Sequence, residues 1–170
     1  MDILVGYASA HQHPINIAVH LIGIPVIMLG IFIPMTWLTV DIDGFALNLA
    51  QITVFAMFIF YLTLDWIFAV VFLMFAIAVA HLAAFLGSYP QPTALIIAAA
   101  AFFGGYAAQF IGHAIEKSMP VLLKHPIQAN LAAPFFTIVE VFKLLGLREA
   151  LFTEVQERIV QLRDHQSIVA

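Results

Sequence analysis

Long apolar runs with almost no charge constrain this chain more than any other feature of its sequence. Every lysine and arginine lies at or beyond Lys117, and the stretch from Ile67 to Leu86 contains no charged residue. A run of about 20 apolar residues is long enough to cross a bilayer as a helix. Charged residues make up 9% of the chain, against roughly 25% in soluble domains. We therefore predict an all-α integral membrane helical bundle.

Prolines, glycines and polar residues divide the apolar runs into segments. Pro14 suits the first turn of a helix, where its missing N–H does no harm. Pro25 and Pro34 are expected to kink or end the helix that follows, and the Gly/Pro-rich segment 87–92 is a clear breaker. Residues 39–44 are expected to form a loop. The sequence thus predicts four spans, at about residues 15–37, 45–62, 67–86 and 93–115.

The chain after the fourth predicted span has a different character. Prolines break residues 118–146 at short intervals, so we expect short apolar helices at the membrane interface. Residues 148–164 alternate charged and apolar side chains with helical spacing, which predicts an amphipathic C-terminal helix. Because all the basic residues lie toward this end, the positive-inside rule places it in the cytoplasm. Four spans would return the N-terminus to the same side, and residues 1–170 are expected to form one domain.

Residues 7–20 concentrate polar groups at the entry of the first predicted span. They hold three of the seven histidines of the chain. Asn16 and His20 are four residues apart and share a helix face, and His13 and His20 lie seven apart on the same side. His11 precedes the proline, so helical periodicity does not restrict it. Ionisable groups inside a membrane segment are costly and indicate a functional site.

Residues 109–117 form a second polar stretch at the end of the fourth predicted span. Gln109, His113 and Glu116 follow the spacing of one helical stripe. Neutral imidazole is a common ligand of iron, zinc and copper, and nearby carboxylates and amides orient such ligands. We expect the two stretches to meet at one membrane face and to hold a metal. The spacing indicates a metal or cofactor between helices without identifying it.

Other features of the composition narrow the classes of function. Cysteine is absent, which excludes disulfides and thiolate ligands. A net charge of −4 and the lack of a basic cluster argue against a nucleic-acid partner. A lone histidine in a membrane helix often serves only in packing, which is the simpler interpretation of His81. His125 and His165 are interpreted as loop and tail residues, and His13 is either a ligand or an exposed neighbour of the helix.

The two polar stretches resemble the motifs of a known membrane family. The pattern Tyr7-x3-His11-x4-Asn16-x3-His20, followed by Gly-Ile-Pro, is similar to the opening motif of the family that includes the fungal 2-hydroxy fatty acid dioxygenase of phytosphingosine degradation. Residues 109–120 resemble its second motif, and residues 133–146 resemble its closing segment. The resemblance covers roughly residues 5–148.

This resemblance implies an Fe(II)-dependent dioxygenase that shortens a 2-hydroxy fatty acid by one carbon at the cytoplasmic membrane face. Its partners would be the 2-hydroxy fatty acid, O₂ and membrane lipid, and the oligomeric state is left open. His11, His20 and His113 are the expected iron ligands, and His81 is a further candidate. Supporting or substrate-contacting roles are expected for four more residues, namely Tyr7, Asn16, Gln109 and Glu116.

Three other functions are compatible with the same residues. A zinc-dependent lipid hydrolase would use histidine ligands and a zinc-activated water. A b-type haem protein would use His20 and His113 as axial ligands. A non-enzymatic membrane scaffold or small transporter would need no metal, although no inverted repeat typical of transporters is evident.

Overall fold

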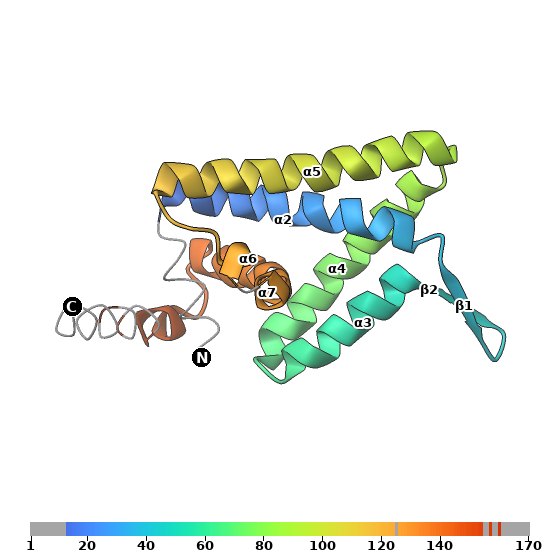
Figure 1. Ribbon diagram of the computed structural model, residues 1–170. Coiled ribbons are helices and arrows are strands. Elements are labelled where there is room, and N and C mark those ends of the chain that lie inside the picture. Colours follow the sequence, from blue (N-terminus) through green and yellow to red (C-terminus); the bar gives the residue numbers. More distant parts are fainter. Residues whose placement is uncertain (1–12, 125, 155–156, 158–159, 161–170) are drawn as a thin grey trace.

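The computed structural model describes residues 13–124, 126–154, 157 and 160, and its fold is the expected all-α helical bundle (Figure 1). A small antiparallel hairpin is the one departure from helix among the elements of the described chain. The elements are, in order, α2 (Pro14–Met35), β1 (Thr39–Ile42), β2 (Phe45–Asn48), α3 (Leu49–Leu62), α4 (Trp66–Gly87), α5 (Gln91–Glu116), α6 (Val121–Lys124) and α7 (Pro126–Leu144).

Helices α2 and α5 lie side by side and run antiparallel along the length of the molecule (Figure 1). Glycines make this close approach possible. A Cβ added to Gly30 of α2 would lie 2.6 Å from the backbone N of Phe102, and one added to Gly105 of α5 would lie 2.6 Å from Cγ1 of Ile27. Small residues at such contacts let membrane helices approach closely enough for extensive van der Waals packing.

The other helices complete the bundle below this pair. Helices α3 and α4 run obliquely next to each other, and α7 is seen nearly end-on beneath α2 (Figure 1). Aromatic rings fill the space where α3, α4 and α7 meet. Tyr61 contacts Phe72 edge-on at a centroid distance of 4.6 Å, and its hydroxyl donates to the carbonyl oxygen of Leu131 at 2.6 Å. That bond provides the buried hydroxyl with the partner it needs in an apolar interior.

Asp65 links the loop between α3 and α4 to the C-terminal part of the chain. Its Oδ1 accepts hydrogen bonds from the backbone N–H groups of Ile67 and Phe68 and so caps α4. Its Oδ2 accepts from Nη1 of Arg148 at 2.6 Å, and the guanidinium lies 4.7 Å from the centroid of the Phe68 ring. One carboxylate thus caps a helix and holds the segment that follows α7.

Within the described part of the chain, four helices are long and apolar enough to cross a membrane, and three of them correspond to the predicted spans at 15–37, 67–86 and 93–115. The four helices are α2, α4, α5 and α7. The predicted span at 45–62 begins instead with strand β2, which leaves α3 with 14 residues. The region 118–146 contains the 19-residue helix α7 rather than a series of short helices. Pro134 lies inside α7, because a membrane helix tolerates proline where neighbouring groups satisfy the freed backbone.

Two smaller expectations also change. The predicted loop at 39–44 belongs to the hairpin, whose two-residue turn is Asp43-Gly44 with φ values of 52° and 86°. Positive φ at both positions is the requirement of a type I′ turn, and Asp-Gly is a preferred sequence for it. Residues 149–154 are helical, in accord with the predicted tail at 148–164. Much of the rest of that tail lies outside the described residues.

The contact between α2 and α5 generates a prediction about stability. We expect Gly30→Ala to lower the free energy of unfolding by about 1–3 kcal/mol, because the added methyl group meets the backbone of α5. Gly104→Ala is the matched control, since no atom outside the neighbouring backbone of its own helix lies within 4 Å of its Cβ position. Reversible unfolding in mixed detergent micelles measures both variants. Equal free energies of unfolding for the two variants would contradict the close contact of Gly30 with α5.

Candidate metal centre

The two polar stretches meet where α2 begins and α5 ends, as the sequence predicted. The His20 and His113 rings lie edge-to-face, with centroids 5.0 Å apart and an interplanar angle of 88°. Both side chains are buried, with exposures of 2% and 4%. Two imidazoles from helices about ninety residues apart in sequence are thus in contact inside an apolar bundle.

Each of these rings is oriented by a hydrogen bond at Nδ1. Nδ1 of His20 lies 2.9 Å from the main-chain carbonyl oxygen of Asn16. Because a carbonyl oxygen can only accept, Nδ1 carries the hydrogen in this bond, and the neutral ring then has its lone pair on Nε2. Nδ1 of His113 lies 2.9 Å from the hydroxyl oxygen of Ser118. In metal sites, bonds of this kind fix the tautomer and the orientation of a histidine ligand.

Glu116 connects the end of α5 to the start of α2. Its Oε1 accepts from the backbone N–H of His13 at 2.9 Å, and its Oε2 accepts from the side-chain amide of Asn16. The Ser118 hydroxyl also donates to Oε2, at a longer distance of 3.5 Å. Glu116 therefore acts on both histidines indirectly, through the two residues that contact their Nδ1 atoms.

Gly112 and Ser118 contribute to the site although sequence reasoning gave neither of them a role. A Cβ at Gly112 would lie 2.5 Å from Oδ1 of Asn16, so only glycine leaves room for the fully buried Asn16. Ser118 reaches His113 because Lys117 adopts a left-handed conformation with φ of 57°, and the Ser118 N–H donates to the His113 carbonyl at 3.1 Å. Glycine usually occupies that position, so Lys117 gives no sequence signal for the reversal of the chain.

The remaining candidates lie in different surroundings. Gln109 lines the cavity beside the histidines, whereas His13 accepts a hydrogen bond from the Ile15 N–H through Nδ1 and caps α2. His81 is exposed on α4, and its Nδ1 is 2.8 Å from the carbonyl oxygen of Ile77. Tyr7 and His11 lie outside the described residues.

Within the described residues, no three histidine, aspartate or glutamate side chains are grouped closely enough to hold a metal. His81 therefore does not complete a ligand set with His20 and His113. Catalytic zinc sites use three protein ligands, and the facial triad of non-haem iron also provides three. Two oriented imidazoles fit the chemistry of such a metal, which would need a further ligand beyond them.

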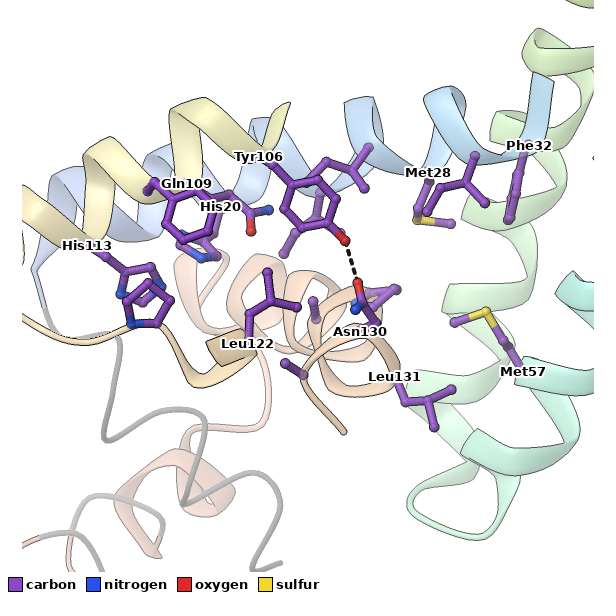
Figure 2. Close-up of a pocket in the computed structure, with 18 of the residues that line it drawn as sticks. His20, Met28, Phe32, Met57, Tyr106, Gln109, His113, Leu122, Asn130 and Leu131 are labelled. Atoms are coloured by element: carbon purple, nitrogen blue, oxygen red, sulfur yellow. Dashed lines mark hydrogen bonds between the residues drawn. The ribbon is translucent and has the colours of Figure 1, made fainter. Parts of the chain in front are cut away.

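A cavity of about 240 Å³ begins at His20 and His113 and extends between the helices (Figure 2). Gln109 and Tyr106 of α5 line one side, and Asn130 of α7 lies opposite, with the Tyr106 hydroxyl donating to Oδ1 of Asn130 at 2.6 Å. Apolar side chains make up most of the remaining wall. The histidine pair is thus the polar end of an apolar chamber.

Comparison with known proteins supports the resemblance seen in the motifs. The family model described as "Mpo1-like: 2-hydroxy-palmitic acid dioxygenase Mpo1-like" matches residues 2–145. This range includes both polar stretches. No curated protein and no solved structure matches the chain.

The bonds of Glu116 generate a second prediction. In Glu116→Gln one carboxylate oxygen becomes an NH₂ group, which faces either the His13 N–H or the Asn16 amide as donor against donor. We expect a loss of about 1–3 kcal/mol in the free energy of unfolding. Glu149→Gln, at an exposed position, is the matched control. If both variants unfold together with the wild type, Glu116 does not connect the two helices in the way the geometry indicates.

Proposed function

We propose that this chain, which belongs to the family of 2-hydroxy-palmitic acid dioxygenase Mpo1-like proteins, is an Fe(II)-dependent dioxygenase. Its reaction would shorten 2-hydroxy fatty acids by one carbon. The observation that carries the proposal is the contact between His20 and His113 at the polar end of an apolar cavity. A 2-hydroxy acid and O₂ together contain the atoms of the shortened acid, CO₂ and water. The reaction therefore needs no other oxidant.

The residues for the iron are His20 and His113, each through Nε2, with His11 as the third ligand predicted from the sequence. When bound, the iron supplies coordination positions and redox chemistry for O₂ and for the hydroxy acid. The protein's own part is to hold the imidazoles in a fixed orientation. The Asn16 carbonyl and the Ser118 hydroxyl do this at Nδ1, and Glu116 holds them in place.

The cavity provides the other half of the proposed site. An acyl chain inside it excludes water from the histidine end and gains burial free energy of about 0.8 kcal/mol per methylene group. Gln109 lines the cavity one turn before His113 and can donate an amide N–H to the carboxylate or the hydroxyl of the substrate. Tyr7 remains a predicted contact for the substrate or O₂. A substrate drawn from the membrane can thus present its head group to the histidines while its tail stays in apolar surroundings.

The zinc hydrolase is the second candidate, because the same imidazole donors also suit zinc. The haem alternative is not favoured by the geometry. Two axial ligands must lie on opposite sides of a porphyrin plane, whereas the His20 and His113 rings contact each other directly at 5.0 Å. A scaffold role would explain the packing of the histidines but not their position at the end of a cavity.

Metal analysis of the anaerobically purified protein tests the proposal first. We expect near-stoichiometric iron in the wild type and its loss in His20→Ala and His113→Ala, because each change removes a ligand. His81→Ala should keep the metal, since His81 is exposed and outside the cavity lining. Zinc in place of iron would favour the hydrolase. A protein without any metal would contradict both enzymes.

Oxygen uptake then tests the reaction. The iron-loaded wild type should consume O₂ with a 2-hydroxy fatty acid and release the acid that is one carbon shorter, detected by mass spectrometry. The fatty acid of the same length without the hydroxyl group is the matched substrate control and should give no uptake. Equal uptake with both acids would exclude a reaction that depends on the 2-hydroxyl group.

A further inference from the structure

We infer that Met28, Phe32 and Met57 form the end wall of the cavity and set the length of acyl chain that the site accepts. The inference rests on the proposed function for the position of the head group at the histidines. The wall itself follows from the shape and the lining of the cavity.

The cavity is elongated along α2. His20, Ile24, Met28 and Phe32 all line it, at intervals of four residues, and so form one stripe of the helix. The twelve steps along the helix from His20 to Phe32 correspond to a rise of roughly 18 Å. Figure 2 shows the same order, with His20, Gln109 and His113 at one end and Met28, Phe32 and Met57 at the other. One helix therefore bears both the polar end and the far end of the cavity.

Tyr106 and Asn130, two polar side chains that line the cavity between these ends, are bonded to each other. The Tyr106 hydroxyl donates to Oδ1 of Asn130, and Nδ2 of Asn130 donates to the carbonyl oxygen of Pro126 at 2.9 Å. A ligand in the cavity therefore does not need to supply polar partners for these groups. A ligand with one polar end and a long apolar remainder matches this distribution, which is the chemistry of a fatty acid.

The far wall is fixed by its surroundings. Phe32 and Met28 are 3% and 5% exposed and belong to the hydrophobic core, so neither can move aside without disturbing the packing. Met57 closes the cavity from α3 and is only partly buried. The volume of about 240 Å³ is below the roughly 300–1,000 Å³ of pockets for drug-sized ligands. It suits a single acyl chain rather than a two-chain lipid.

Substitutions at Met57 test the wall in both directions at one position. Met57→Trp fills the far end, and Met57→Ala enlarges it with little risk to the buried core. The readout is the binding of saturated fatty acids of graded length, without a hydroxyl group, by competition with a radiolabelled fatty acid in detergent. This measurement requires neither iron nor turnover. Met74→Trp and Met74→Ala are the matched controls, because Met74 is 61% exposed on α4 and does not line the cavity.

We expect Met57→Trp to weaken binding of the longest acid that the wild type binds well by about tenfold. That change corresponds to about two methylene groups losing burial at about 0.8 kcal/mol each. Met57→Ala should move the preferred length upward, and both Met74 variants should keep the wild-type profile. Opposite shifts at Met57 alone would support the inference.

The outcomes separate this inference from the proposed function. An unchanged length profile in both Met57 variants would overturn the end wall, even if the wild type still consumes O₂ with a 2-hydroxy acid. A wild type that binds none of the fatty acids would also overturn it. The Met57 variants could shift the preferred acyl length in opposite directions in a protein that holds no iron. That result would support the end wall of an acyl-binding cavity and would contradict the dioxygenase proposal.

Discussion

The close packing of α2 against α5 is the constraint on which the rest of the structure depends. Glycines on both helices keep the axes near each other, and Gly105 and Gly112 are spaced seven residues apart along α5. At Gly112 the approach makes room for Asn16, and one residue later His113 meets His20. The histidine contact is therefore a consequence of helix packing, because bulkier residues along this seam would push the two imidazoles apart.

Hydrogen bonding explains how an apolar bundle keeps these polar groups. An unpartnered polar group in a bilayer interior costs several kcal/mol. Hydrogen bonds partner most polar atoms of this cluster, and Oδ1 of Asn16 is the buried side-chain atom that lacks a partner among the described residues. Asn16 forms hydrogen bonds within α2 and to α5. Its main-chain carbonyl oxygen accepts from His20 of α2, and its side-chain amide donates to Glu116 of α5. Glu116 in turn accepts from the His13 N–H at the start of α2. The network closes on itself at the end of the bundle, which is why the histidines can be both buried and oriented.

The sequence predicted the helical class and the breaks between the predicted spans at 45–62, 67–86 and 93–115, because hydropathy, glycine and proline determine these features locally. The polar residues at the ends of two predicted spans also predicted the meeting of the two histidine stretches. The sequence did not predict α7, because Pro134 was taken to break a helix that its neighbours in fact stabilise. Gly112 and Ser118 were missed for a related reason. Their roles depend on a contact between helices and on the left-handed conformation of Lys117, and neither has a local signal. The sequence also does not show which face of a helix is exposed, so it left both a packing role and a ligand role open for His81, which is exposed on α4.

Helix α2 couples the histidine end of the proposed site to its apolar end. Because His20 and Phe32 belong to the same continuous helix, helical rise fixes the distance between them, and sliding α2 would move both ends together. Pro25 lies between them without interrupting the helix. The length of the chamber therefore cannot be adjusted through α2 without changing the histidine contact as well. Helix α3 has no such restriction, since it supplies Met57 to the far wall and, among the described residues, contributes none of the metal-site side chains. If the cavity holds an acyl chain as proposed, changes in chain-length preference are thus most readily made on α3.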